Sequence, residues 1–331
     1  MNEKDIYFLE NYGKIFEKNG EGKLETYLFQ SNDGSILYRY LKREIPIKLN
    51  NITYYDTITP YGYGGPILLE LKNLQNKKKL FKDFNEALEK KFKDEKIVSS
   101  FIRFHPLIKN QEISMREMDI EYNRDTIAID LSSEKLIWEN IHSKCRNMIR
   151  KAEKNNIEIV IKETINEEDI DKFYELYKNT MIKNSASNYY IFSKEFFMNH
   201  FDLLEGNIKL VIALYEEKVI CSAIILEYDD YIHYHFSGSD MDYKSLAATN
   251  LLLYKVALYG YKNGFKYFHL GGGYSGNEDS LFKFKHSFNK NEKLNFFIGK
   301  KIYDIFIYEN LIEEKKKVTK ELNEKYFPLY R

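Results

Sequence analysis

Residues 231–288 contain three segments that set the expected fold: YIHYHFSGSD (Tyr231–Asp240), YFHLGGG (Tyr267–Gly273) and SLFKFKHSF (Ser280–Phe288). The first two are strand-like runs that lead into polar or glycine-rich turns, and a helix-like run separates them. The third carries Lys283 and Lys285 beside the glycine loop. Backbone N–H groups and ammonium groups together suit a pyrophosphate or a tetrahedral oxyanion. The stretch therefore predicts an anion site after a buried strand.

The placement of the two lysines depends on the local backbone. If Phe282, Phe284 and Phe288 anchor the last segment, Lys283 and Lys285 lie on the opposite face of an extended segment or are split across a helical turn. Gly272 and Tyr274, from the loop that runs to Gly276, are further candidate binding residues. A lysine pair in an ordinary surface loop is the alternative.

The same order of elements occurs twice. From Ile208 the chain shows three strand-like runs with short turns, then a helix over residues 245–263 and the strand that ends in Gly271. In the first half, KLETYLFQ and SILYRYLKR flank Asn32-Asp33-Gly34, a β-hairpin signal. A helix over residues 80–92 and the strand IVSSFIRFHP follow. This order predicts a duplicated α+β unit.

Composition limits the class of protein. The 331 residues include 44% hydrophobic and 16% aromatic residues, enough for two folded domains. Lys plus Arg equals Asp plus Glu at 50 each, so no overall field favours stable DNA binding. Cys145 and Cys221 lack metal-ligand spacing, and no secretion signal or apolar run of about 20 residues is found. We expect a soluble, reduced, cytoplasmic protein.

Several common sites have no sequence motif here. The chain lacks the phosphate-binding G-x-x-x-x-G-K-[ST], the dinucleotide-binding G-x-G-x-x-G, H-E-x-x-H and G-x-S-x-G. His233 and His235 are two residues apart on a strand and could share a face, but no acidic or cysteine cluster completes a metal site. We therefore expect no metal and no tightly bound cofactor.

Other candidate binding residues lie outside the central stretch. Tyr61 and Tyr63 belong to a turn rich in Tyr, Gly and Pro that either lines a cleft or packs as a loop. Arg103 lies in an apolar strand, where it is ion-paired in the core or directed at a ligand. Tyr189 and Tyr190 follow small polar residues, which suits a substrate loop or a capped turn.

A helix near residues 134–154 has apolar and basic residues on opposite faces. Its basic face, which includes Arg146, Arg150, Lys151 and Lys154, is either a solvated surface or a phosphate-binding surface.

Short motifs in a characteristic order resemble the FemABX aminoacyltransferases and related FemAB-like acyltransferases of the GNAT superfamily. They are KCRNMIRKA (Lys144–Ala152), YKNGFKYFHLGGG (Tyr261–Gly273) and FKHSF (Phe284–Phe288) in the second half, with GGP (Gly64–Pro66) and RFHP (Arg103–Pro106) in the first. Lys285 matches the lysine of the F-K-x-G-F motif, in which Ser287 here replaces the glycine.

The resemblance implies an α+β fold of two tandem GNAT-like domains with mixed, largely antiparallel sheets flanked by helices. The expected first domain comprises residues 1–133 and 300–331, and the second residues 134–299, with substrate bound in an interdomain cleft. In such proteins the motif lysine contacts the precursor phosphate and the reacting carbonyl region, so Lys285 is expected to do so here.

We expect direct attack of a neutral amine on an ester or thioester carbonyl, driven by orientation and oxyanion stabilisation. Lys285 would stabilise charge, assisted by Lys283 and Arg103, and the substrate's own groups or Asp240 would take the proton. The side chains expected to shape the cleft are Tyr63, Tyr189, Tyr190 and His235.

Three hypotheses for function follow. The first is aminoacyl transfer from aminoacyl-tRNA to an amine of a peptidoglycan or surface-glycan precursor, either nucleotide-linked or lipid-linked, which would allow peripheral membrane contact. The second is acyl-CoA-dependent N-acylation of an amino sugar or polysaccharide precursor, although DYKSLAATN (Asp242–Asn250) lacks the R-x-x-G-x-G loop of ordinary GNAT enzymes. The third is a non-catalytic glycan-precursor binding protein.

Overall fold

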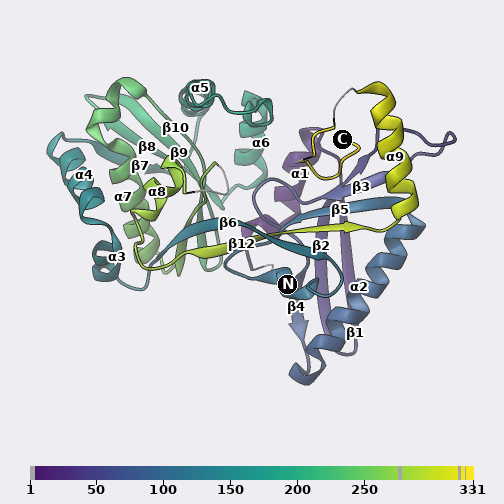
Figure 1. Cartoon of the computed structure of the whole chain (residues 1–331). Helices are drawn as coiled ribbons and strands as arrows, with labels where there is room; N and C mark the ends of the chain where they lie inside the picture. Colours follow the sequence, from purple (N-terminus) through teal and green to yellow (C-terminus); the bar gives the residue numbers. More distant parts are fainter. Residues whose placement is uncertain (1–3, 275–277, 320–321, 325) are drawn as a thin grey trace. The chain divides into compact units, whose positions relative to one another are not determined.

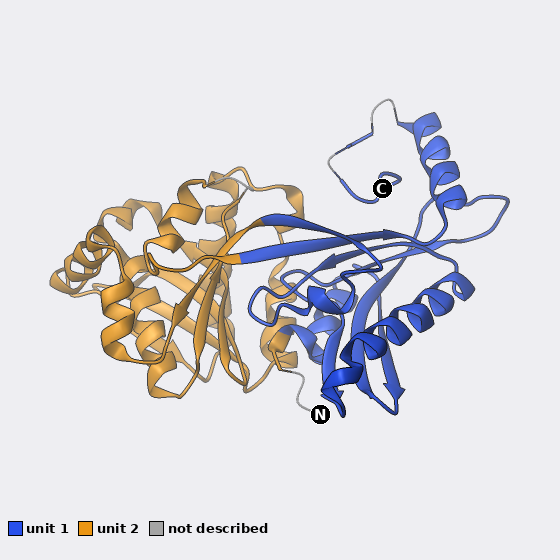
Figure 2. Cartoon of the chain, turned by 60° about the horizontal axis from the view of Figure 1, so that its bottom comes forward, with its two compact units in different colours: residues 1–3, 7–123, 295–331 blue, residues 4–6, 124–294 orange. Residues whose placement is uncertain are grey.

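The computed structural model describes residues 4–274, 278–319, 322–324 and 326–331, so Gly276 of the predicted loop lies outside the described residues. Within this part the chain forms two compact units (Figure 2). Unit 1 comprises residues 7–123 and 295–331, and unit 2 comprises residues 4–6 and 124–294. Among the described residues the chain thus passes between the units at 6/7, 123/124 and 294/295, whereas the predicted domains divide at 133/134 and 299/300.

Unit 1 is built on an antiparallel hairpin, as its sequence predicts. β1 (Lys23–Ser31) and β2 (Gly34–Glu44) are joined by Asn32-Asp33, with Ser31 paired to Gly34. A Cβ on Gly34 would lie 2.2 Å from the Glu70 carbonyl oxygen, so only glycine fits between β2 and β4 (Ile67–Leu71). β3 (Tyr55–Ile58), β5 (Ile97–Arg103) and β12 (Leu294–Ile302) extend the sheet.

Helices cover both faces of the unit 1 sheet. α2 (Lys77–Asp94) buries Leu80, Phe84, Leu88 and Phe92, whose four-residue spacing predicts its inner face. These side chains share an apolar cluster with Ile97 of β5. The neighbouring Val98 packs in a second cluster with α9 (Ile305–Val318). Adjacent strand residues point to opposite faces, so α2 and α9 lie on opposite sides of β5. α1 (Glu10–Lys18) completes the unit.

Unit 2 contains the meander predicted from Ile208. β7 (Glu158–Lys162), β8 (Ile208–Tyr215), β9 (Lys218–Tyr228) and β10 (Tyr231–Ser239) are antiparallel neighbours, and β11 (Tyr267–Gly271) pairs parallel to β10. β6 (Asp119–Asp130), whose last residues belong to this unit, pairs antiparallel to β11.

The helices of unit 2 divide between the two faces of its sheet (Figure 1). α3 (Glu134–Asn140), α4 (Ser143–Lys154) and α7 (Ala248–Lys262) pack together over one apolar core. α5 (Glu167–Lys183) and α6 (Lys194–Leu203) bring an aromatic cluster against β10, including Tyr177, Phe197 and Phe236. α8 (Ser280–His286) follows the glycine loop.

Both units share one strand pattern. In unit 1 the order β1-β2-β3-β5-β12 has antiparallel, antiparallel, parallel and antiparallel pairings. In unit 2 the order β8-β9-β10-β11-β6 has the same four pairings. A helix, α2 or α7, joins the parallel strands in each. The duplicated α+β unit predicted from the order of elements is confirmed.

A search of the described helices for a membrane span finds none that is both long and apolar enough.

Candidate functional site

The helix α8 decides how the two motif lysines are placed. Asp279 caps this helix by accepting a hydrogen bond from Phe282 N at 2.9 Å. The helical turn buries Phe282 and Lys285, three residues apart, and leaves Lys283 exposed. Of the two placements left open by the sequence, the split across a helical turn is therefore correct. Ser287, at the glycine position of the motif, has φ −65°, which any residue can adopt.

Lys285 is a buried cation at the end of β11. Its Nζ donates a hydrogen bond to Gly272 O at 2.8 Å and lies 5.9 Å from the centre of the Tyr234 ring. Burial lowers the pKa of Lys285 to about 8; the carboxylate of Asp279 opposes this lowering, and the nearby charge of Arg124 adds to it. An ammonium group has three N–H donors, and among the described residues Lys285 uses one of them, so the other two can contact an anionic ligand or a developing oxyanion.

The glycine loop is shaped by close approaches on both sides. Gly271 has φ +77°, where β11 shifts register against β6. A Cβ on Gly272 would lie 2.9 Å from Asp125 O, and one on Gly273 would lie 2.5 Å from the Asp279 carboxylate. Larger residues would push the loop away from β6 and from the start of α8.

Arg124 is a site residue that the sequence did not reveal. Its Nη1 donates to Gly273 O at 2.8 Å, next to the carbonyl that Lys285 uses. Two cations thus hold consecutive carbonyl groups of the loop. The sequence has no local sign of this contact, because it depends on the pairing of β6 with β11 across more than 130 residues. Tyr234 also has no local signal, because its contact with Lys285 depends on tertiary packing, whereas Asp279 has one: it is a helix-capping residue three positions before Phe282.

Tyr274 follows the loop and is 60% exposed. Its hydroxyl accepts a hydrogen bond from Asn184 Nδ2 at 3.1 Å, at the C-terminal end of α5. Tyr189 and Tyr190 lie between α5 and α6, are also exposed, and have ring centres 5.3 Å apart. Tyr177 of α5 fixes this segment by donating to Tyr190 O at 2.6 Å. Exposed aromatic rings of this kind can bind an amphipathic ligand.

His233 and His235 have different neighbours because β10 shifts register against β9 between Tyr234 and Phe236. His235 packs 5.6 Å from His200, and burial together with His200 and His233 holds its pKa well below the ordinary value. It is a neutral part of the aromatic interior.

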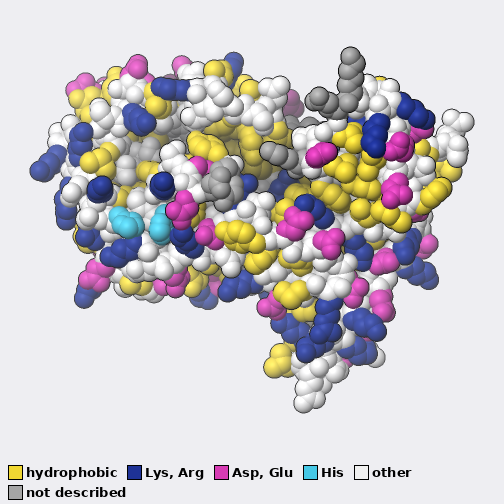
Figure 3. All heavy atoms as spheres, viewed as in Figure 1, with side chains coloured by type: hydrophobic (Ala, Val, Ile, Leu, Met, Phe, Trp, Pro, Cys, Tyr) yellow, Lys and Arg dark blue, Asp and Glu magenta, His cyan; other side chains and the backbone are white. Residues whose placement is uncertain are grey.

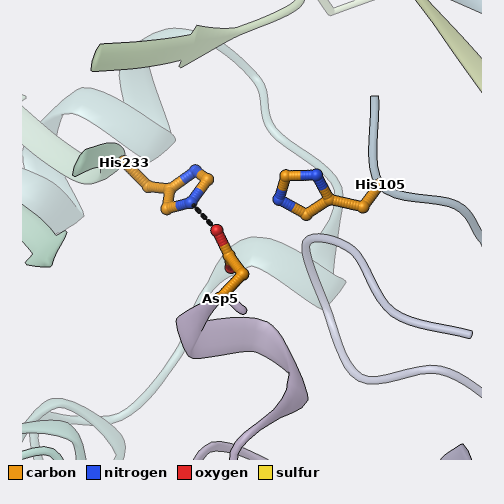
Figure 4. Close-up of side chains that lie close together, drawn as sticks. All are labelled: Asp5, His105 and His233. Carbon is orange, nitrogen blue, oxygen red and sulfur yellow. Dashed lines mark hydrogen bonds and ion pairs between the residues drawn. The ribbon is translucent and has the colours of Figure 1, made fainter. Parts of the chain in front are cut away.

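The buried His233 Nε2 instead lies 2.7 Å from Asp5 Oδ2, as Figure 4 shows. On its other side its ring is 5.5 Å from that of His269.

Asp240 borders a groove of about 490 Å³ in unit 2. The groove lies between α5, the start of β9 and the end of β10, and its lining includes three lysines and three acids: Lys172, Lys183, Lys218, Glu175, Glu217 and Asp240. Asp240 Oδ2 accepts a hydrogen bond from Lys218 at 2.9 Å, which lowers the pKa of the carboxyl. The groove can hold a polar ligand of either charge, but Asp240 in this state is a weak base.

Of the candidates in unit 1, Tyr63 is packed into the interior, whereas Tyr61 and Arg103 are half-buried. Tyr63 is 9% exposed, with edge-on ring contacts to Tyr7, His105 and Phe296. The carbonyl of Tyr61 accepts a hydrogen bond from the Tyr12 hydroxyl at 2.6 Å.

Arg103 donates to Thr59 O at 3.2 Å and lies 4.9 Å from the Phe101 ring. Among the described residues it has no carboxylate partner, so the predicted alternative of a core ion pair is not what the structure shows.

Comparisons with known proteins place these features in a class. Residues 140–285 match the family described as Acetyltransferase (GNAT) domain. The crystal structure of FemX is similar over 91% of this chain and 93% of its own, with a TM-score of 0.68 and 12% identity. The structure of L-PGS from Bacillus licheniformis is similar over 87% and 90%, with a TM-score of 0.54 and 11% identity.

The C-terminal domain of a putative lysylphosphatidylglycerol synthetase from Agrobacterium fabrum is similar over 89% and 93%, with a TM-score of 0.52 and 10% identity. No curated protein sequence matches the chain. The match identifies an acyltransferase domain of the GNAT type in residues 140–285, and the similarity to FemX shows the fold of the chain. The resemblance to FemABX and FemAB-like GNAT proteins, predicted from short motifs, is confirmed.

Proposed function

We propose that this acyltransferase moves an aminoacyl group from aminoacyl-tRNA to an amine of a peptidoglycan or surface-glycan precursor. The observation that carries the proposal is Lys285, a buried ammonium held at the Gly272 carbonyl in a fold similar to that of FemX. The fold is also shared with a protein named as a lysylphosphatidylglycerol synthetase, and that name describes an aminoacylated product. A tRNA donor would place the reaction in the cytoplasm.

The reaction needs no covalent enzyme intermediate. The neutral amine attacks the ester carbonyl, its nitrogen forms the new C–N bond, and the carbonyl oxygen becomes an oxyanion. The C–O bond to the tRNA ribose then breaks, and the amine proton passes to the leaving oxygen, giving an amide and free tRNA. Lys285 donates hydrogen bonds to the oxyanion or to a precursor phosphate from a fixed, largely dry position, where such bonds are strongest.

The proton is carried by the substrate's own groups in this proposal. Asp240 is the protein carboxylate named for this step, but Lys218 holds it in its ionised form with a lowered pKa. A base with a lowered pKa accepts a proton poorly at neutral pH. Asp240 and the other charged groups of the groove are better suited to orient a polar part of the acceptor or donor.

A second candidate is acyl-CoA-dependent N-acylation of an amino sugar. The match of residues 140–285 to the acetyltransferase domain favours it, since that match covers the meander, α7 and the glycine loop. The same attack would occur on a thioester, with Lys285 in the same role. Acceptors linked to a nucleotide or a lipid are compatible with either donor, and a lipid-linked one would bring the protein to a membrane surface.

A side-by-side assay of charged tRNA and acetyl-CoA against a nucleotide-sugar panel tests the proposal. We expect transfer from charged tRNA, and we expect Lys285→Ala to lower the rate at least about tenfold, equivalent to ~1.4 kcal/mol. Lys283→Ala is the matched control, because it removes an exposed lysine from the same helix. Unchanged rate and affinity in Lys285→Ala would refute the role of Lys285.

A further inference from the structure

The helix α4 has a high local positive charge, although the net charge of the whole chain is zero. It carries five basic residues and one acidic residue, Glu153, although the whole chain has equal numbers of each sign. Cys145, Ile149 and Ala152 face the core, so the basic side chains lie on the remaining surface: Lys144, Arg146, Arg150, Lys151 and Lys154. Figure 3 shows Lys and Arg side chains gathered over α4 at the edge of unit 2.

The residues that the structure describes do not neutralise these charges. Glu153, the one acidic residue of α4, lies 3.5 Å from Lys255 of α7 and forms its ion pair with that lysine rather than with a basic residue of α4. None of the five basic residues forms an ion pair with a carboxylate among the residues that the structure describes. Like charges on neighbouring turns of a helix repel one another, and a bound polyanion would remove that repulsion.

Two of the guanidinium groups are already oriented. Arg150 and Arg146 lie 5.1 and 5.9 Å from the Trp138 ring of α3. Arg146 Nη1 also donates to Ile141 O at 2.9 Å, which fixes it without a negative partner. Guanidinium groups held near an aromatic ring lose less entropy when they bind phosphate than freely mobile ones do.

The basic surface is continuous with the candidate site. His142, directly before α4, donates its backbone N–H to Ser287 O at the end of α8, at 2.8 Å. The rings of His142 and His286 are 5.8 Å apart. A long anion that lies along α4 therefore reaches the helix that carries Lys285.

We propose that the exposed basic surface of α4 binds the phosphate backbone of the RNA donor and leads its acylated end toward α8. This inference rests on the proposed function. RNA fits better than a membrane, because a membrane-surface helix inserts an apolar face and that of α4 is buried in the core. On α4 the exposed large apolar side chain is Met148, at 40%.

The test uses a fluorescein-labelled RNA hairpin with the sequence of a tRNA acceptor arm, titrated over a range of KCl. The variant Lys144→Gln/Arg150→Gln/Lys151→Gln/Lys154→Gln should bind at least about tenfold more weakly at 0.1 M salt. Its slope of log affinity against log salt should be shallower by about 3, because four phosphate contacts are lost. In the native protein, binding should also change the fluorescence of Trp138, the one tryptophan of the sequence.

The matched control removes the same charge from exposed lysines of unit 1: Lys48→Gln/Lys72→Gln/Lys78→Gln/Lys90→Gln. It should bind like the native protein, and thermal unfolding should confirm that both variants are folded. Should the α4 variant be unstable, Lys151→Gln/Lys154→Gln alone should give about half the change in slope.

Binding of the native protein and the α4 variant to phosphatidylglycerol vesicles is measured in parallel. Three results would overturn the inference: the native protein does not bind the hairpin, the control variant is weakened as much as the α4 variant, or the α4 variant loses vesicle binding but keeps its RNA binding. The proposed function fails separately. If the native protein transfers from charged tRNA and the α4 variant keeps the same KM for it, only the inference is wrong. If transfer occurs from acetyl-CoA alone, the proposed donor is wrong.

Discussion

The two units close the ends of their parallel strands in opposite ways. In unit 1 the chain after β5 is packed: His105 and Asn110 are buried, and Asn110 holds the Gly64–Pro66 loop through hydrogen bonds of 2.8 and 2.9 Å. In unit 2 the chain after β11 is a glycine loop held by two cations, Lys285 and Arg124.

The cavities show the same contrast. The one beside α2 in unit 1 has about 10 Å³, space for a single water molecule at most, whereas the groove at the end of β10 has about 490 Å³. One strand pattern therefore supports both a filled interior and an open, charged site. The difference comes from side chains after the strands, because the strand order and pairing directions are the same.

The largest expected effect is in unit 1, from Asn110→Ala. Asn110 accepts from His105 N and donates to Gly64 O and Pro66 O, all in the interior. Its removal leaves three buried backbone groups without partners, so we expect the free energy of unfolding to fall by about 3 kcal/mol or more. Circular dichroism would follow the loss, and Trp138 fluorescence would report on unit 2.

The control for this prediction is Asn73→Ala. Asn73 is exposed and accepts one hydrogen bond, from Gln75 N, so its loss should cost about 1 kcal/mol or less. Equal destabilisation by the two substitutions would mean that the end of β5 is not a packed support.

The opposite sign is expected in unit 2 for Lys285→Met. The lowering of the Lys285 pKa from 10.5 to about 8 corresponds to about 3 kcal/mol of destabilisation by the buried charge at neutral pH. Methionine removes that charge but leaves Gly272 O without its donor, which costs ~1–2 kcal/mol. We expect a net rise in the free energy of unfolding of ~1–2 kcal/mol at pH 7, measured by Trp138 fluorescence in urea, together with loss of transfer.

The pH dependence of the free energy of unfolding tests the prediction for Lys285→Met. Between pH 8 and 10.5 the unfolded chain binds more protons at Lys285 than the folded chain, so the native protein gains stability as the pH rises. The advantage of Lys285→Met should be full below pH 8 and shrink toward pH 10.5. The exposed Lys283→Met is the control and should change stability little; a loss of stability in Lys285→Met at pH 7 would contradict the cost assigned to the buried charge.

Elements set by local patterns were predictable from the sequence. The spacing of Leu80, Phe84 and Leu88 predicts α2, and Asn32-Asp33-Gly34 predicts the β1–β2 hairpin. The pairings that complete each sheet were not predictable, because Ile129 of β6 pairs with Phe268 and Ile102 of β5 pairs with Gly299. Pairings across more than 130 residues have no local signal.

The candidate site divides in the same way. A glycine loop with a following lysine is visible in the sequence, and it led to Lys285 and Gly272. The burial of Lys285 depends on α8 being a helix rather than an extended segment, which the alternation of Phe and Lys does not determine. The neutral His235 and the exposure of Lys283 depend on tertiary packing, which is also not encoded in the neighbouring residues.

The smallest expected effect is that of Arg124→Gln, and it addresses how the open end of β11 is tuned. Glutamine keeps a donor for Gly273 O but removes a positive charge that helps to lower the pKa of Lys285. The pKa of Lys285 should therefore rise. If transfer needs the ammonium form, the native rate falls as the pH rises through about 8, and this limb should move to higher pH in the variant by a few tenths of a unit. Below pH 7 the rate should fall about threefold or less, because the loop keeps its contact with Lys285.

Steady-state rates from pH 6 to 9.5 measure both effects of Arg124→Gln. Arg103→Gln is the control in unit 1, because Arg103 is anchored to Thr59 O and Phe101. A limb that stays in place or moves to lower pH would show that Arg124 supports the loop without influencing the charge of Lys285.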